Sequence, residues 1–498
     1  MERLDRKGNQ LQQLSVIAMS LTGLLSAGFV LLDTDRPACY QLLWLLPVAF
    51  SLDCILIYPL RRFLFTRISF TMISGLYWVR MVATPVFLVL GDYQVVPENT
   101  SWQNYLDQAF ILEIYESLVV FLLLLALGSY LEQAPRSVVS KAEKIRYTVP
   151  FCIMYGSVCA FFLGMILLYP TLVRYQFITI LGAPPGWSIV LEQRSLDGSG
   201  SGPLGVLVTL WCNLIFIMQL TLPAVILTWV LNHRRRWSGV RVVFSAFLLI
   251  GATFFIATES RNYSVISALA LLLTLMAYSD KKQLRLEAAA LVLLAFAALF
   301  GLWYKAAFSG RLSFENPFLL LSTIITSYFS GPQNIAASIE AAKQMGGSDP
   351  LLLLADIKQA VPFLSTLINR ICSSTLVSTN TLFNSILYND PSAAYTDQIV
   401  PAIGQGYMIA GPLLAPIFPA FTAMISVLLE RGASQSKWLI EKNVCYAGAI
   451  LMALCQVINN LGIALMYLWY IVLAAIFAYF THIQERPTFS HEYRQPTA

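Results

Sequence analysis

Residues 109–131, AFILEIYESLVVFLLLLALGSYL, decide the class of protein. As a helix this stretch is long enough to cross about 30 Å of hydrocarbon, and Glu113 and Glu116 are its only charged residues. Their spacing of three places both carboxylates on one helix face. Apolar runs of similar length recur along the chain, so the sequence predicts an all-α polytopic membrane protein.

The composition supports this prediction. Hydrophobic residues make up 57% of the 498 residues, charged residues only 12%, and the mean hydropathy is +0.67. A soluble protein has about twice that charged fraction. The net charge of +5 is typical of basic cytoplasmic loops and does not indicate nucleic-acid binding.

Hydropathy predicts about twelve spans. The first follows a basic start without a small-residue cleavage site, so it is expected to remain uncleaved. The predicted spans are 14–32, 42–60, 68–90, 109–131, 149–168, 205–231, 242–258, 262–279, 286–304, 405–429, 443–460 and 464–482.

The distribution of Lys and Arg predicts the orientation. With a cytoplasmic N-terminus, the cytoplasmic segments hold 22 of these residues and the outer segments 9. Cytoplasmic loops are normally enriched in Lys and Arg, so both termini are expected inside.

The same topology defines three parts. Residues 1–304 form an N-terminal membrane domain of about nine spans, residues 305–404 a large outer loop, and residues 405–498 the closing spans and a cytoplasmic tail. Two amphipathic stretches in the loop are expected to be helices, one after the break at Gly331–Pro332 and one after Asp349–Pro350.

The residue types on the predicted outer side restrict the chemistry. All three histidines fall on the cytoplasmic side, and the sequence has no HExxH, P-loop or GxSxG motif. We therefore expect no metal and no cofactor, and chemistry that uses arginine, carboxylate, tyrosine and amide groups.

The arginines suggest the substrate class. Arg261 lies in the tight turn TESRN between two predicted spans, and Arg311 and Arg370 lie in the outer loop. Guanidinium groups bind phosphate oxygens bidentately, which suits a lipid-linked diphosphate at the membrane interface. Arg261 could instead set topology, and the loop arginines could pair with acids.

Two charges lie near the predicted midplane. Asp53 and Arg80 are expected to form a buried salt bridge, because isolated charges at this depth are costly. Glu113 and Glu116 could balance Arg80 or Arg261. Glu116, or Glu259 beside Arg261, is a candidate catalytic base, and Arg80 a candidate substrate-binding residue.

Amide and aromatic side chains are frequent on the predicted outer side. Such groups suit sugar recognition, although they are equally typical of a membrane interface. The candidates are Asn262, Tyr328, Asn334 and Tyr407.

Three stretches resemble the Wzy-type polymerases of bacterial oligosaccharide repeat units. They are ATESRNYSVISALALLLTLMAYSDKK, SYFSGPQNIAASIE and AIGQGYMIAGPLLAPIFPAF, and together they cover roughly residues 245–430. The resemblance implies a GT-C-like fold in the bacterial inner membrane with a periplasmic site. It implies undecaprenyl-diphosphate-linked glycans as substrates and membrane lipids as surroundings. A polysaccharide chain-length regulator is a candidate partner, and the sequence leaves open whether one binds.

By the same resemblance, the growing glycan passes to the non-reducing end of a new lipid-linked repeat. Arg261 would hold the diphosphate, assisted by Arg311 and Arg370. A polysaccharide flippase or another transporter is the main alternative, and an O-antigen ligase-like glycosyltransferase is the other. The outer loop and the absence of internal repeats favour the polymerase over the transporter.

Overall fold

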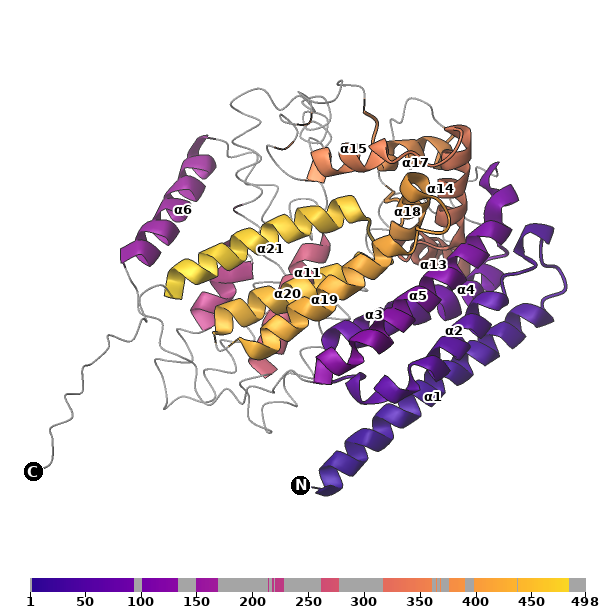
Figure 1. The fold of residues 1–498 in the computed structure, drawn as a ribbon, viewed down its shortest axis with the longest axis horizontal. Helices are drawn as coiled ribbons and strands as arrows, with labels where there is room; N and C mark the ends of the chain where they lie inside the picture. The colour runs from indigo at the N-terminus through magenta and orange to yellow at the C-terminus, as the bar shows by residue number, and fades with distance from the viewer. Residues whose placement is uncertain are drawn as a thin grey trace, which may run out of the picture. The chain divides into compact units, whose positions relative to one another are not determined.

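A computed structural model describes residues 2–93, 101–132, 149–168, 261–276, 317–360, 376–389, 398–436 and 438–482, with parts of 214–227 and positions 364 and 368. Every regular element in these ranges is a helix (Figure 1). Five helices are long and apolar enough to cross a membrane, as expected of a helical membrane protein: Gln10–Leu32, Ala38–Leu56, Ile68–Leu90, Ser101–Gly128 and Leu461–Tyr479.

The chain divides into two compact units, which are described separately. Unit 1 comprises Met1–Ser137, Val292–Gln435 and Cys445–Trp469, and unit 2 comprises Val138–Leu291, Ser436–Val444 and Tyr470–Ala498. This grouping by compactness cuts across the predicted division at residues 304 and 404, which stays a prediction about topology.

The first part of unit 1 is a bundle of apolar helices. Its elements are α1 (Glu2–Leu32), η1 (Ala38–Tyr40), α2 (Leu45–Leu56), η2 (Tyr58–Phe63), α3 (Ile68–Trp78), η3 (Val79–Ala83), α4 (Thr84–Leu90), η4 (Ser101–Tyr105) and α5 (Leu106–Glu132). Helix α1 packs against α2, and α2 packs against α5. The predicted span 68–90 coincides with α3, η3 and α4.

The later part of unit 1 contains shorter helices. They are α13 (Pro317–Tyr328), α14 (Pro332–Gln344), α15 (Leu351–Ala360), α17 (Thr379–Leu387), α18 (Ala402–Ala410) and α19 (Ile417–Gln435). The predicted helix starts after Gly331–Pro332 and Asp349–Pro350 are confirmed. Proline suits a helix start because its missing N–H is not needed there.

The prediction of one span over 405–429 is wrong. The chain leaves α18 at Gly411, whose φ of +79° is a conformation that favours glycine, and α19 begins at Ile417. The short helix α18 packs on α14, so this part of the chain enters the bundle as two separate helices.

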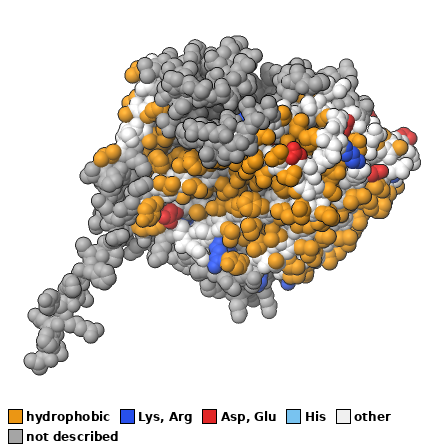
Figure 2. Space-filling view, turned by 45° about the horizontal axis from the view of Figure 1, so that its top comes forward, with side chains coloured by type: hydrophobic (Ala, Val, Ile, Leu, Met, Phe, Trp, Pro, Cys, Tyr) orange, Lys and Arg blue, Asp and Glu red, His pale blue; other side chains and the backbone are white. Residues whose placement is uncertain are grey.

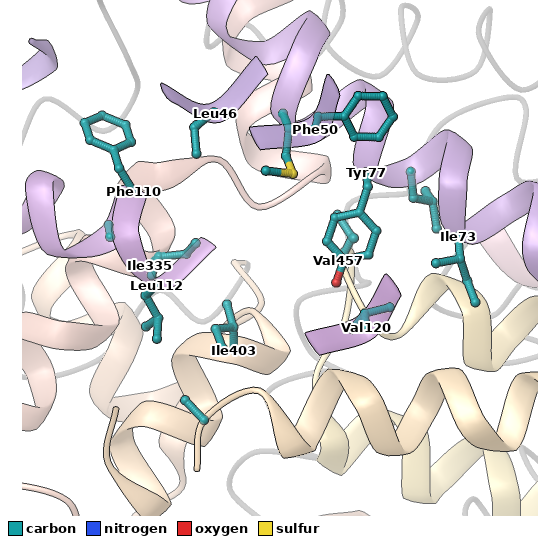
Figure 3. Close-up of a cluster of buried hydrophobic side chains, with 14 of the residues drawn as sticks. Leu46, Phe50, Ile73, Tyr77, Phe110, Leu112, Val120, Ile335, Ile403 and Val457 are labelled. Carbon is teal, nitrogen blue, oxygen red and sulfur yellow. The ribbon is translucent and has the colours of Figure 1, made fainter. Parts of the chain in front are cut away.

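The core of unit 1 joins the early spans to the later helices. Figure 3 shows Phe110 and Leu112 of α5 beside Ile335 of α14 and Ile403 of α18, within one buried cluster that extends to Tyr77. Residues 332–342 of α14 are all buried. The later helices therefore form part of the folded bundle.

Side-chain contacts define two ends of unit 1. At one end, Gln333 of α14 donates to the Tyr40 hydroxyl (3.4 Å), Ser101 of η4 donates to Glu340 of α14 (2.9 Å), and Tyr93 donates to Asp33. At the other end, the Glu430 carboxylate of α19 accepts from the N–H groups that open α3. The connections α1–α2 and α4–η4 thus lie at the same end as α14.

Unit 2 contains α6 (Val149–Leu168), α11 (Arg261–Met276), the start of α20 (Leu439–Leu454) up to Val444, and the part of α21 (Leu461–His482) from Tyr470 onward. Asn443 of α20 donates to the carbonyl of Leu220 (2.7 Å) and accepts from Thr274 of α11 (3.2 Å).

The predicted break between the last two spans, at INNLG, is confirmed by the gap between α20 and α21.

The described surface is largely apolar. In Figure 2, hydrophobic side chains cover most of the described part of the face shown, and charged side chains are few. Leu32 is 82% exposed and Ile55 is 66% exposed. Apolar exposure on this scale is expected where lipid replaces water as the solvent.

Candidate functional site

A charged cluster lies inside the spans of unit 1. The Arg80 Nε lies 3.2 Å from Glu113 Oε1, and its Nη1 lies 3.0 Å from Glu116 Oε2. The Tyr77 hydroxyl donates to Glu116 Oε1 at 3.0 Å. All four side chains are fully buried, so the ion pairs are shielded from solvent.

The local backbone explains where Arg80 lies. The π-helical turn η3 interrupts the helix between α3 and α4, and Pro85 follows it with no N–H to donate. Side-chain hydroxyls replace part of the lost bonding: Thr84 donates to the Val79 carbonyl (3.1 Å), and Ser26 donates to the Val82 carbonyl (2.9 Å). The π-helical turn thus places the Arg80 guanidinium next to the glutamates of α5.

The predicted Asp53–Arg80 salt bridge is wrong. The ion pairs of Arg80 within the described residues are with Glu113 and Glu116, whose shared helix face was predicted correctly. Asp53 of α2 instead lies near Ser117 of α5, whose hydroxyl donates to the Ile114 carbonyl (2.9 Å). The rotation of α2 and of α5 about their own axes decides which carboxylate lies next to Arg80. Hydropathy does not predict that rotation.

This arrangement limits the roles predicted for Glu116 and Arg80. Each Glu116 oxygen already has a partner, Tyr77 for one and Arg80 for the other. A carboxylate held in this way is poorly placed to accept a proton from a substrate hydroxyl. Both residues have no exposed surface in the described structure.

The second polar centre lies among the later helices. Asp356 of α15 accepts from the backbone N–H of Thr379 (3.0 Å), from the Thr379 hydroxyl (2.6 Å) and from Gln405 Nε2 (2.5 Å). Gln405 Oε1 accepts from the N–H of Leu461 (2.7 Å). The Asp356 carboxylate thereby joins α15 to α17 and α18, and Gln405 joins α18 to the start of α21.

Burial raises the pKa of the Asp356 carboxyl, and the hydrogen bonds from Thr379 and Gln405 oppose that rise. Sequence reasoning did not identify this centre. The one sequence signal for it is Asp356, the single acidic residue in the largely apolar stretch LLLLADIKQ. Its hydrogen-bond partners are far from it in the chain.

Three residues predicted from the sequence lie in the later helices, two at the bend between α13 and α14 and one on α18. Tyr328 ends α13, and Asn334 in the first turn of α14 is buried, with its Nδ2 3.5 Å from the Thr326 carbonyl. Tyr407 lies on α18, half-buried and within electrostatic reach of Tyr105. They belong to one end of unit 1.

A cation lies beside Tyr105. The Lys343 ammonium of α14 sits 4.2 Å from the centroid of the Tyr105 ring and donates to Gln108 Oε1 (3.2 Å). Lysine, aromatic and amide groups thus meet where α14 crosses η4 and α5.

The remaining predicted residues are only partly described. Arg261 and Asn262 open α11, one position from the predicted start of that span, and their side chains are not described. Glu259, Arg311 and Arg370 lie outside the described residues. Within the described residues, no group of three or more His, Cys, Asp or Glu side chains could hold a metal ion.

Comparison with protein-family models, with curated proteins and with solved structures finds no match for this chain.

Proposed function

We propose that this protein is a metal-independent, GT-C-like glycosyltransferase that polymerises oligosaccharide repeat units linked to undecaprenyl diphosphate. The observation that supports this proposal best is the position of α14. The helix follows the SYFSGP bend, is buried along 332–342, and packs on α5, η4 and α18 at the end of unit 1 where α1 meets α2. A long non-spanning segment folded onto the ends of spans suits an interfacial substrate.

The chemistry of this end fits a glycan with a charged lipid anchor. Tyr105 and Tyr407 offer aromatic faces, Gln108 an amide, and Lys343 a cation. Aromatic and amide groups suit sugar rings, and the cation suits an anionic headgroup.

In the proposed reaction the growing chain leaves its diphosphate carrier for the non-reducing end of a new repeat. Arg261, Arg311 and Arg370 are proposed to stabilise the negative charge that develops on the departing diphosphate. The site would face the periplasm of a bacterial inner membrane, with both termini in the cytoplasm.

A transporter is the second candidate, and the buried charged cluster favours it. Arg80, Glu113 and Glu116 lie in the spans, where charged groups often line transport or proton pathways. A flippase would use these groups and would not elongate the glycan.

Surface-polysaccharide length separates the two candidates. In a strain lacking the chromosomal copy, the Arg261→Ala protein at matched levels is expected to reduce a ladder of chain lengths to one capping repeat. Loss of all surface glycan would favour a flippase or ligase, and an unchanged ladder would remove Arg261 from the proposal.

Two further variants control this experiment. Arg261→Lys keeps the charge but loses bidentate hydrogen bonding, so the ladder is expected to stay shortened. Lys343→Ala removes a cation that already has partners, Tyr105 and Gln108, and is expected to shorten the ladder less than Arg261→Ala does.

A further inference from the structure

The charged cluster in the spans of unit 1 has more acidic groups than basic groups. Arg80 faces Glu113 and Glu116, and Asp53 lies within electrostatic reach of Tyr77 in the same cluster. Arg80 and both glutamates have no exposed surface, and Asp53 is 5% exposed. If every carboxyl group were ionised, one cation would face three anions in a medium of low dielectric constant.

The contacts show which carboxyl group the guanidinium neutralises. Glu116 has a contact on each oxygen: Arg80 Nη1 forms an ion pair with Oε2, and the Tyr77 hydroxyl donates a hydrogen bond to Oε1. A nearby cation and a hydrogen-bond donor both stabilise the ionised form of a carboxyl group. Arg80 and Glu116 therefore form a neutral ion pair.

The other two carboxyl groups are less well paired. Glu113 forms its ion pair with Arg80 through Oε1, and neither Glu113 oxygen nor Asp53 Oδ2 has a hydrogen-bond partner in the described structure. An unpaired ionised carboxylate without solvent costs far more than an unpaired neutral carboxyl group. The geometry thus disfavours negative charge at both positions.

Helices α1, α4, α13, α14 and α19 bring no further cation to the cluster. From Gln10 to Leu32, α1 has no charged residue, and neither α4 nor α13 has one. On α14, Glu340 and Lys343 have partners at η4 and α5, and on α19, Glu430 binds the start of α3 and Arg431 lies over the Tyr130 ring. The other titratable group on α2 is the buried thiol of Cys54, which supplies no positive charge.

We propose that Glu113 and Asp53 each hold a proton near neutral pH, so that this cluster is a proton-binding site inside the membrane domain. Two protons bring the cluster to neutrality, with Arg80 and Glu116 as its one ion pair. The inference is independent of the proposed polymerase activity, because protonation is measured without a substrate.

The proposal predicts how stability depends on pH. In the folded protein these two carboxyl groups hold protons near neutral pH. In the unfolded protein they are exposed to water and release those protons at the same pH. Because the folded state then binds more protons than the unfolded state, stability falls as the pH rises.

Infrared spectroscopy of the full chain tests the protonation directly. The protein is purified in a detergent without ester groups, because ester carbonyl bands overlap those of protonated carboxyl groups. Near neutral pH, the wild type is expected to show a protonated-carboxyl band that weakens in Glu113→Gln and in Asp53→Asn. Glu340→Gln is the matched control and should leave it unchanged, because Ser101 and Gln344 both donate to Glu340.

Thermal unfolding gives a second readout. Glutamine resembles a protonated glutamate, so Glu113→Gln is expected to shift the Tm by less than about 2 °C and to flatten its dependence on pH. Glu116→Gln removes the ionised partner of Arg80 and is expected to lower the Tm by roughly 5 °C or more.

Two results would overturn the proposal. One is a band that neither Glu113→Gln nor Asp53→Asn weakens, with Glu113→Gln as destabilising as Glu116→Gln, since Glu113 would then be ionised. The other is a Tm that rises with sodium concentration at fixed pH and ionic strength, since a metal cation would then supply the missing charge.

Discussion

Two buried polar networks in unit 1 differ in how completely their groups are paired. Around Asp356, each carboxylate oxygen accepts a hydrogen bond, and the amide of Gln405 is bonded through both its nitrogen and its oxygen. Around Arg80, by contrast, the three guanidinium nitrogens, both Glu113 oxygens and Glu116 Oε2 have no hydrogen-bond partner in the described structure, so the contacts of Arg80 are ion pairs. A fully paired network stabilises one arrangement of helices, whereas an incompletely paired one retains groups that can bind a proton or a ligand.

The largest effect is expected in the incompletely paired network. Arg80→Met would leave Glu116 without its cation inside the spans, at a cost of about 3–5 kcal/mol in the free energy of unfolding. Unfolding by titration with SDS in mixed micelles would measure this loss.

A double variant sharpens that result. Arg80→Met combined with Glu116→Gln removes both charges of the ion pair, so most of the lost stability is expected to return. Equal losses in the single and double variants would mean that packing of the arginine stem, not charge, dominates.

Substitutions in the fully paired network around Asp356 should lower the free energy of unfolding by less. Asp356→Ala removes three hydrogen bonds to one carboxylate and is expected to cost about 2–3 kcal/mol, whereas Asp356→Asn keeps an acceptor and should cost less. The same SDS titration applies. A larger loss for Asp356→Asn than for Asp356→Ala would contradict this interpretation of the network.

The pH dependence of Asp356 has a definite sign. Because burial raises its pKa above that of the unfolded chain, its favourable contribution is complete at low pH and decreases as the pH rises through the raised pKa. Unfolding titrations of wild type and Asp356→Asn at several mildly acidic pH values would show this, with a flatter profile for the variant.

Close packing beside the paired network predicts an intermediate effect. A Cβ atom on Gly406 of α18 would lie 2.4 Å from the carbonyl oxygen of Ala415, where the backbone itself would have to move. Gly406→Ala is expected to cost about 2 kcal/mol. A Cβ atom on Gly28 of α1 would meet nothing within 4 Å. Gly28→Ala is therefore the control and should not lower the free energy of unfolding.

The smallest effect is expected at the opposite end of the bundle. Glu430 accepts from the N–H groups of Ile68 (2.8 Å) and Ser69 (2.9 Å) and thereby caps α3. Glu430→Gln keeps one acceptor oxygen but loses the charge that favours a helix N-terminus, at about 1 kcal/mol. Thermal unfolding would detect it as a small fall in Tm, and a loss as large as that of Arg80→Met would contradict the capping role.

The sequence predicted features that depend on local signals. The outer limits of the span formed by α3, η3 and α4, the start of α11 to within one residue, and the start of α14 after Gly331–Pro332 all follow from hydropathy, glycine and proline. Such signals lie within a few residues of the feature that they determine, so one sequence is enough to find them.

Features that depend on tertiary contacts were not predictable in this way. The partner of Arg80 depends on how α2 and α5 rotate relative to η3, and the Asp356 network requires α15, α17 and α18 to meet. The break at Gly411 lies inside a run whose hydropathy alone indicates one continuous span.

Elongation by the purified protein tests the proposed function most directly. The full chain is reconstituted in liposomes with a repeat unit linked to undecaprenyl diphosphate, and the products are separated by length. The proposal predicts a ladder of longer lipid-linked glycans with the wild type, formed without added metal, and none with Arg261→Ala. Movement of the repeat unit across the bilayer without any increase in its length would contradict polymerisation and indicate transport.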